Sequence, residues 1–413
     1  MRNFGVKYNN NKLSLLRQTA SVMRAELREV FSDGGVLLIM VFAIFIYTTL
    51  YGLVYGSEVL REVPIAVVDM SHTSSSRSLT SALEEGPSVR VAFVAQDMEQ
   101  ARRLLYERKI YGVVYIPADY ERCLVGGTQA DVAIYCDASY FLIYRVAFER
   151  MVTTLTATGA MVEFRRLVAR GLGESQAMAV VEPVSYESHT LFNPYLGYGT
   201  FVMPAIIIII IQQTLLMGVG IIGVTKPPKK ELSELDFMLN TECSAAALMM
   251  GRVITYFMVS GAVAAMALTL PYYLFGYPML GSAWSVVAVV VPYILACTML
   301  GIALSTLFRS REEPIMWLLW SSIPILMLSG VSYPTSAMPE PLAMAGKLLP
   351  SSHAVEAFLR VRDMGASVED VVPSIVALWI QTLLYGCCAF LLVSHQMKKR
   401  GRPNLSDDLT LVN

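Results

Sequence analysis

The stretch "LSGVSYPTSAMP", Leu328 to Pro339, places helix-breaking residues where a membrane helix would be expected to continue. It ends a window without Asp, Glu, Lys or Arg that begins at Pro314. That window is long enough to cross a bilayer, which takes about 20 apolar residues in a helix. Gly330, Pro334 and Pro339 nevertheless interrupt its second half. Because lipid offers no hydrogen bonds to a freed N–H or C=O group, the fold has to supply them from elsewhere in the protein.

Charge-free windows recur along the 413-residue chain, which is 55% hydrophobic and only 16% charged. Such a composition is too apolar for an ordinary soluble protein. The windows are Gly34–Ser57, Thr190–Thr225, Val253–Phe308, Pro314–Pro339 and Val371–Gln396, and "FGYPMLGSAW" gives the longest of them a central turn. We therefore predict a polytopic α-helical membrane protein with six transmembrane helices at residues 34–55, 198–224, 253–276, 284–308, 314–338 and 371–395.

Lys and Arg in the short loops predict the orientation of these spans, because cytoplasmic loops are enriched in both residues. They gather in the N-terminal arm, in the loops after the second and fourth spans and in the C-terminal tail, whereas the loop between the third and fourth spans has none. Both termini are therefore expected in the cytoplasm, with an arm (1–33), a loop (225–252) and a tail (396–413). Residues 56–195 and 339–370 are expected outside the cytoplasm.

The arm contains "KLSLLRQTASVMRAELREVF", in which apolar and charged residues alternate at helical spacing just before the first span. This pattern is typical of an interfacial helix that lies on the membrane lipids. A solvated helix packed on a soluble partner fits the same pattern. Both alternatives stay open at this point.

Residues 56–195 are predicted to form an extracytoplasmic α/β domain. Four Val/Ile-rich runs have the length of strands: "VPIAVVDM" (63–70), "VRVAFVA" (89–95), "IYGVVYIP" (110–117) and "ADVAIYCD" (130–137). "SSSRSLTSALEE" and "DMEQARRLLYERK" have helical spacing, and a long helical run follows from Phe141 to about Val168. Cys123 and Cys136 could pair if this domain lies outside the cytoplasm. Their spacing fixes no geometry, so unpaired thiols are the favoured alternative.

The sequence contains no set of residues typical of an active site. Its four histidines, His72, His189, His353 and His395, do not pair at ligand spacing, and H-E-x-x-H, G-x-S-x-G and C-x-x-C motifs are absent. No G-x-x-x-x-G-K-[ST] loop is present to bind nucleotide phosphates. The predicted spans also lack the ionisable residues that ion-coupled carriers place there. We expect no catalytic, metal or cofactor site in this chain, and any energy for transport to come from another chain.

The most polar positions within the predicted spans are Gln212 and Gln213, which follow the run "PAIIIIII". Adjacent residues point about 100° apart on a helix, so at most one of the two amides faces a given partner helix. Hydrogen bonding between helices is the favoured interpretation. Contact with a transported substrate is the alternative. The net charge of −1 indicates no class of partner, and we expect no nucleic-acid partner.

Several local sequences resemble the type-2 permease family of ATP-binding-cassette exporters. "CDAS" (136–139) is similar to the family's D-G-S strand end, with Ala138 in the Gly position, and "FNPYLGYGTFVMP" (192–204) resembles its N-P-x-L-x-x-x-x-F-x-x-P entry into the second span. "MMGRV" (249–253) resembles the G-K-x opening of the third span. Residues 328–358 are similar to an S-G-x-x-x-P…M-P…L-P-x-x-x-A stretch. In this order, the motifs extend the resemblance over residues 12–397.

The resemblance implies a type-2 ABC exporter transmembrane fold, with the α/β domain inserted between spans one and two. It implies an inner-membrane permease that pairs with a second protomer and with an ATPase subunit, which would hold ATP and Mg. A periplasmic adaptor and an outer-membrane channel are further partners of such exporters. It also implies that Gly330, Pro334 and Pro339 form a re-entrant element beside the substrate exit. The alternative is a span that simply ends near Gly330.

In that family the loop after the second span carries a coupling helix with the sequence R-E-x-G-T, which contacts the ATPase. The corresponding loop here contains "KKELSELDFML" and has no Gly-Thr pair. Its short, charged and amphipathic character still favours a coupling role. The residues expected to contact an ATPase are Lys229, Lys230, Glu231, Glu234 and Asp236.

The favoured function is a permease that exports an amphiphilic or drug-like substrate, because the predicted pathway is free of charge. The alternative is a membrane receptor or scaffold whose extracytoplasmic domain binds a ligand without transport. A membrane-embedded enzyme is disfavoured by the missing catalytic groups. The residues do not identify the substrate, nor do they distinguish a homodimer from a heterodimer.

Overall fold

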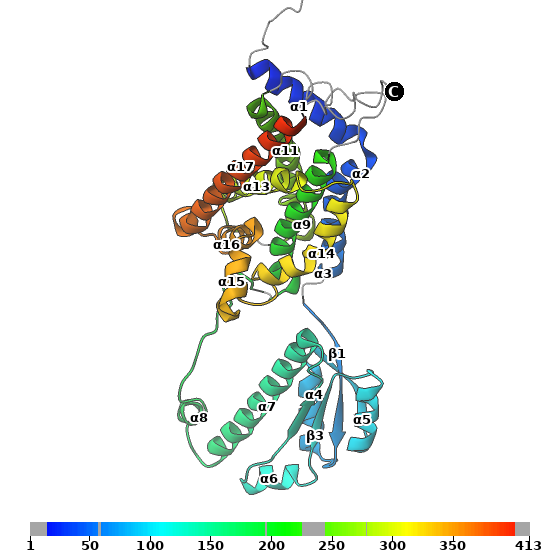
Figure 1. The fold of residues 1–413 in the computed structure, drawn as a ribbon. Coiled ribbons are helices and arrows are strands. Elements are labelled where there is room, and N and C mark those ends of the chain that lie inside the picture. The colour runs from blue at the N-terminus through cyan, green and yellow to red at the C-terminus, as the bar shows by residue number, and fades with distance from the viewer. Residues whose placement is uncertain (1–14, 57–58, 195, 225–243, 278, 401–413) are drawn as a thin grey trace, which may run out of the picture. The chain divides into compact units, whose positions relative to one another are not determined.

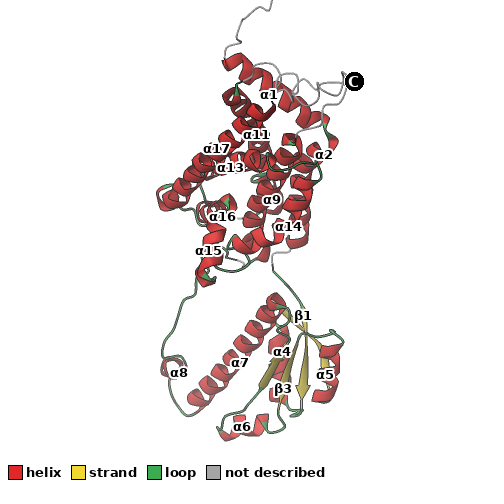
Figure 2. Cartoon of the chain, in the orientation of Figure 1, coloured by secondary structure: helices red, strands yellow, loops and turns green. Residues whose placement is uncertain are grey.

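The computed structural model describes residues 15–56, 59–194, 196–224, 244–277 and 279–400. They form two compact units (Figure 1). A helical unit contains residues up to 58 and from 190 onward, and an α/β unit contains residues 59–189. All strands in the described chain belong to the second unit, as Figure 2 shows.

The α/β unit is built on a sheet with strand order β2-β1-β3-β4. β1 pairs in parallel with β2 and β3, whereas β4 runs antiparallel to β3. Each strand falls within one of the four predicted runs. The strands are β1 (Val63–Asp69), β2 (Val89–Ala95), β3 (Gly112–Ile116) and β4 (Ala133–Cys136), and the helices are α4 (Ser74–Glu84), α5 (Met98–Tyr106), α6 (Tyr120–Gly126), α7 (Phe141–Ala169) and α8 (Glu174–Val181).

Helices cover both faces of this sheet. Leu79 and Leu83 of α4 and Met151 of α7 pack with the buried β1 residues Ile65 and Val67 on one face. On the other face, Ala101 of α5 packs with Ala66 and Val68. Because alternate β1 residues point to opposite faces and both faces are covered, β1 is almost wholly apolar. Cys123 and Cys136 are both free thiols.

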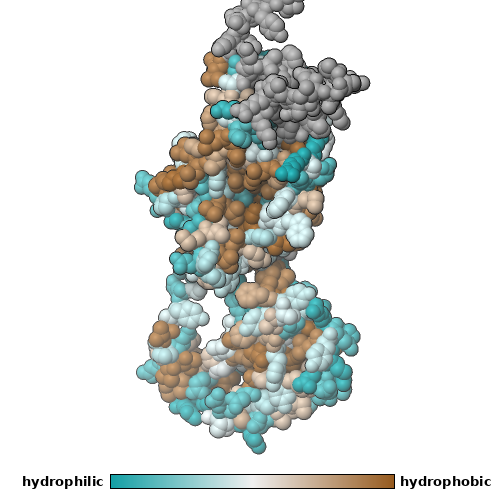
Figure 3. Space-filling model, in the orientation of Figure 1, coloured by the Kyte–Doolittle hydropathy of each residue, from teal (hydrophilic) through white to brown (hydrophobic). Residues whose placement is uncertain are grey.

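The helical unit consists of long apolar helices, and apolar side chains cover much of its visible surface in Figure 3. Its main helices are α1 (Leu15–Ser32), α2 (Gly34–Leu37), α3 (Ala43–Tyr55), α9 (Tyr198–Gly223), α11 (Ala245–Ala267), α12 (Leu270–Phe275), α13 (Ala283–Ser305), α14 (Glu313–Leu328), α15 (Glu340–Lys347), α16 (Pro350–Arg362) and α17 (Val372–Arg400). A π-helical turn η1 (Leu38–Phe42) joins α2 to α3, and short 3-10 turns η2 (Thr335–Ala337) and η3 (Glu369–Val371) precede α15 and α17.

Helix α9 lies at the centre of this unit. It packs against α3, α13, α14 and α16. Its isoleucine run is buried nearly throughout, including Ile207, Ile208 and Ile211. A helix that is apolar on all sides is expected to be surrounded by other helices, and α9 is the member of the unit that fits this description.

Within the described ranges, five helical segments are long and apolar enough to cross a membrane: 34–55, 198–223, 245–275, 283–305 and 369–398. The sixth predicted span, 314–338, corresponds to the shorter apolar helix α14, which has 16 residues. At 1.5 Å per residue, α14 is about 24 Å long, less than the ~30 Å hydrocarbon core.

Two helices extend beyond the predicted ends of their spans. Helix α11 begins at Ala245, inside the predicted loop 225–252, and α17 continues to Arg400, past the predicted end at 395. Both predictions relied on charged residues to mark the ends of spans. Arg252, the last residue of the predicted loop, lies within α11, where it is buried beside a carboxylate.

Candidate functional site

Helix α14 ends because Gly330 turns the chain away from helical geometry. The N–H of Ser329 still donates to the main-chain oxygen of Ile325 at 3.0 Å. Gly330 then adopts a φ of +85°. A Cβ at this position would also lie 3.0 Å from Cγ2 of Thr335. Both the backbone conformation and the available space therefore favour glycine, and the helix cannot continue.

The two prolines of the broken segment stand directly before helical turns. Pro334 precedes the turn η2, and its carbonyl accepts the N–H of Ala337 at 3.0 Å. Pro339 precedes α15 and accepts the N–H of Leu342 at 3.0 Å. Since proline lacks an N–H group, a position that needs no amide donor suits it. The chain therefore changes direction at each proline and starts a new helical turn there.

Helix α15 returns to the end of α14. Gly346 lies so close to it that a Cβ at that position would be 2.8 Å from the main-chain oxygen of Leu328. The hydroxyl of Ser352 also donates to that oxygen at 3.4 Å. We call α14, η2, α15 and the start of α16 the hairpin. Its chain folds back on itself instead of continuing as one helix.

Side chains from α17 and α16 bond the carbonyl groups that this reversal leaves without helical partners. The amide nitrogen of Gln381 donates to the oxygen of Lys347 at 2.8 Å. Nε2 of His353 lies 3.0 Å from the same oxygen and donates when it carries the proton. The hydroxyl of Tyr385 donates to the oxygen of Leu348. The hydrogen bonds missing from the broken helix therefore come from neighbouring helices.

Gln212 of α9 accepts a hydrogen bond from a backbone N–H group of the hairpin. Its Oε1 accepts the backbone N–H of Ser351 at 2.9 Å, in the first turn of α16, where amide groups have no intrahelical partner. The thiol of Cys297 on α13 donates to the same oxygen at 3.7 Å. Gln212 and Ser351 are both fully buried. Gln212 thus joins α9, α13 and the hairpin.

Gln213 lies beside it but makes no corresponding bond. It is 7% exposed, and neither its oxygen nor its nitrogen has a hydrogen-bond partner among the described residues. The contacts of Gln212 show that it links helices. A role of either glutamine in a substrate pathway stays a prediction.

The predicted coupling residues lie outside the described residues, namely Lys229, Lys230, Glu231, Glu234 and Asp236.

Sequence reasoning missed Gln381, Tyr385 and His353. Gln381 and Tyr385 are four residues apart in the mainly apolar middle of α17, a spacing that places both on one face. That pair of polar groups was the available signal. Their partners, the carbonyl groups of residues 347 and 348, could not be inferred without the fold.

A buried ionic cluster joins α1 to α11 in the same unit. Oε1 of Glu26 accepts from Nε of Arg252 at 2.6 Å, and its Oε2 accepts the hydroxyl proton of Tyr256 at 2.6 Å. Glu26 and Tyr256 have no exposed surface, and Arg252 is 8% exposed. Glu26 follows Val22 and precedes Val30 on the apolar stripe of α1. A carboxylate at such a position was the sequence signal for this cluster.

Within the described ranges, no group of three or more His, Cys, Asp or Glu side chains is arranged to hold a metal ion. The bonds described above instead position helices and loops against one another.

Residues 35–391 match the family model described as ABC-2 family transporter protein. The chain belongs to the ABC-2 transporter family. The predicted family resemblance is therefore confirmed.

Two relatives of this ABC-2 permease cover most of its length. Inner membrane transport permease YhhJ of Escherichia coli (strain K12) is 24% identical over 377 residues, which are 88% of this chain and 93% of the relative. Probable multidrug ABC transporter permease YbhR of the same strain is 20% identical over 375 residues, which are 90% of this chain and 96% of the relative. An ABC-2 permease is the membrane part of an ABC transporter, and this membership implies an ATPase partner.

Proposed function

We propose that the chain is the permease subunit of an ABC exporter, which moves an amphiphilic or drug-like substrate out of the cytoplasm or the inner membrane. ATP would be hydrolysed, with Mg, on a separate subunit. Both termini would lie in the cytoplasm and the α/β unit outside it. The observation that carries the proposal is the hairpin, whose freed backbone groups are bonded by Gln212, Gln381 and Tyr385.

This bonding supports a function because a continuous helix would be simpler. Spanning alone requires only an uninterrupted apolar helix, whose backbone groups bond one another. The chain instead uses a positive φ at Gly330 and polar side chains from α9 and α17. Irregular backbone at membrane depth is tolerated where protein or a water-filled cavity surrounds it. A substrate exit on the outer side of the membrane is such a place.

The contact with the ATPase is proposed for the loop that contains Lys229, Lys230, Glu231, Glu234 and Asp236. Helix α11 begins directly after this loop, at Ala245. The pair Glu26–Arg252 then holds α11 against α1. A displacement of the loop by the ATPase would therefore be passed to both helices together.

A second protomer, identical or different, is proposed to pack against α14. This helix leaves Trp317 and Trp320 69% and 80% exposed, whereas α9 is buried nearly throughout. Large exposed aromatic side chains suit either another protomer or lipid. A periplasmic adaptor and an outer-membrane channel would complete the exporter.

The experiment is a triple substitution of Glu231, Glu234 and Asp236 by Ala, made in membranes that also contain the ATPase. We expect ATPase stimulation by the permease to fall while the amount of permease in the membrane stays unchanged. A matched triple variant at exposed acidic residues of the α/β unit, Glu84, Glu174 and Glu182, should stimulate normally. Normal stimulation and normal copurification of the loop variant would contradict the proposed contact at this loop, whereas a wild-type chain that neither copurifies with the ATPase nor stimulates it would favour a receptor that binds a ligand without transport.

A further inference from the structure

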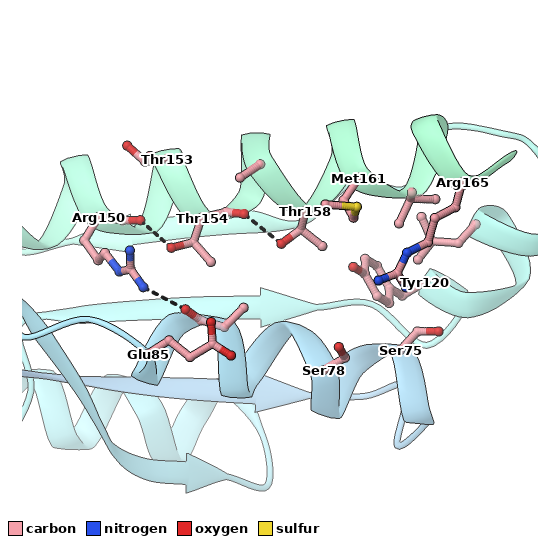
Figure 4. A pocket seen from close by; sticks show the side chains of 14 residues that line it. Ser75, Ser78, Glu85, Tyr120, Arg150, Thr153, Thr154, Thr158, Met161 and Arg165 are labelled. Atoms are coloured by element: carbon pink, nitrogen blue, oxygen red, sulfur yellow. Dashed lines mark hydrogen bonds between the residues drawn. The ribbon is translucent and has the colours of Figure 1, made fainter. Parts of the chain in front are cut away.

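The α/β unit contains a cavity that the function proposed above does not use. Its volume is about 510 Å³, and it lies between α7 on one side and α4 and α6 on the other (Figure 4). A second cavity of about 350 Å³ shares Tyr120, Leu124, Thr158 and Val162 with it. Sites for small ligands have volumes of roughly 300–1,000 Å³. Both volumes fall within that range, and the larger cavity is large enough for a small ligand without the second.

Two arginine side chains hold α7 in place on either side of this cavity. Nη2 of Arg150 donates to the oxygen of Ala82 at 2.8 Å, in the last turn of α4. Nη2 of Arg166 donates to the oxygen of Leu124 at 2.8 Å, in the last turn of α6. Carbonyl groups at helix C-termini lack intrahelical partners and attract cations. Because α7 is fixed at both points, the cavity between them is a built part of the fold.

The cavity wall has an excess of positive charge. Arg150 and Arg165 line it together with one carboxylate, that of Glu85. Arg165 reaches across the cavity toward Tyr120 on α6, as Figure 4 shows. Glu163, the acidic residue nearest to Arg165 in the sequence, is paired with Arg166 at 2.8 Å instead. Nε of Arg150 has no hydrogen-bond partner among the described residues. That atom is buried, whereas Arg165 is exposed and its guanidinium group has donors for a ligand.

The rest of the wall combines apolar surface with hydrogen-bond acceptors. The hydroxyls of Thr154 and Thr158 donate to carbonyl groups of α7 itself, at 2.8 and 2.7 Å, which leaves their oxygen lone pairs as acceptors. Apolar atoms come from both sides of the cavity, from Ala82, Leu124, Ala157, Met161 and Val162. A ligand that matches this wall carries an acidic group and an apolar part.

We propose that this cavity binds a small anionic amphiphile, with its carboxylate or phosphate on Arg165 and its apolar part against Leu124 and Met161. A guanidinium and an acidic group form charge-assisted hydrogen bonds, which are stronger than neutral ones. A cationic amphiphile would meet like charge at the same place. The cavity is complete within residues 59–189, so the site goes beyond the proposed transport and is tested without it.

The test measures hydrogen–deuterium exchange of the full chain in lipid nanodiscs during titration with octyl phosphate. We expect saturable protection of the amides in α6 and in the middle of α7. Arg165→Gln should weaken the apparent affinity about tenfold, the loss expected for one charge-assisted contact. Arg165→Lys, which keeps the charge, should retain most of it. Arg170→Gln is the matched control, because it removes the same charge from the exposed end of α7, outside the cavity.

Further arms distinguish the features of the ligand. Ala157→Phe, which fills the cavity without a change of charge, should abolish protection. Octyltrimethylammonium should not protect α6, and inorganic phosphate alone should protect it only at much higher concentration. Absence of protection by octyl phosphate in the wild type would overturn the proposal. Protection as strong as that of the wild type in both Arg165→Gln and Ala157→Phe would also overturn it. Equal protection by inorganic phosphate would contradict the apolar part of the site. Binding is read without ATP or ATPase, so failure here leaves the exporter proposal untouched.

Discussion

The side-chain amide of Gln381 on α17 donates a hydrogen bond of 2.8 Å to the main-chain oxygen of Lys347, the last residue of α15. One turn further along α17, Tyr385 donates to the oxygen of Leu348. These two bonds hold the returning arm of the hairpin against a long helix that is far from it in the sequence. They are also the donors that lipid could not supply.

Removal of both donors should therefore loosen the hairpin. In the double variant Gln381→Leu and Tyr385→Phe, the oxygen of Leu348 loses the donor described here, while that of Lys347 keeps only His353. A hydrogen bond of this kind contributes about 0.5–1.5 kcal/mol to stability. We expect a lower Tm in detergent and reduced export. Leu384→Met, an apolar exchange at an exposed position of α17, is the control and should leave both quantities unchanged.

The cluster of Glu26, Arg252 and Tyr256 gives a second prediction. Glu26→Gln leaves the buried Arg252 without its counter-charge, and breaking a buried ion pair in this way costs about 3–5 kcal/mol. The Tm of that variant should fall clearly. Replacement of both partners, Glu26→Leu with Arg252→Leu, removes the uncompensated charge and should recover much of the loss. A double variant no more stable than Glu26→Gln would contradict this account of the pair.

Asp363, directly after α16, should make stability depend on pH. Burial raises the pKa of its carboxyl group to about 7, although Arg362 lowers it in part. In an unfolded chain the pKa of Asp is about 3.9. The folded protein therefore binds an extra proton between these values, so stability should fall as pH rises from about 4 to about 7 and then level off.

The measurement for Asp363 is the Tm at several pH values, in the wild type and in Asp363→Asn. The substitution replaces the carboxyl group by a neutral amide of similar shape. We expect its Tm to change less than that of the wild type over this interval. Parallel curves for the two proteins would show that another group carries the dependence.

Local features of the hairpin could be predicted from the sequence, whereas its long-range bonds could not. Gly330, Pro334 and Pro339 act through their own backbone restrictions, so the end of a regular helix near Leu328 could be predicted from those residues alone. Gln381 bonds a carbonyl group 34 residues away, and Gln212 bonds an amide 139 residues away. Such partners depend on how α9, α16 and α17 pack.

The start of α11 shows the same limit for charged residues. The predicted loop 225–252 ends at Arg252, because an isolated charge is costly inside a membrane. Its partner Glu26 is 226 residues away, which no window of the sequence contains. In the α/β unit, the strands and the long helix α7 followed from local patterns. The cavity beneath α7 depends on two hydrogen bonds from arginine side chains to carbonyl groups of other helices. Local sequence patterns do not predict these bonds, so they could not predict the cavity.

The most direct test of the central claim is export by membrane vesicles that contain the permease and its ATPase, normalised to the amount of permease. The variant combines Gly330→Leu with Pro334→Ala. A leucine at the positive φ of Gly330 costs about 1–2 kcal/mol, which favours continuation of α14 as a straight helix. We predict a strong loss of export with little change in abundance, because both new residues are compatible with lipid. Full export by this variant would contradict the account, since the break would then be only the place where a helix ends.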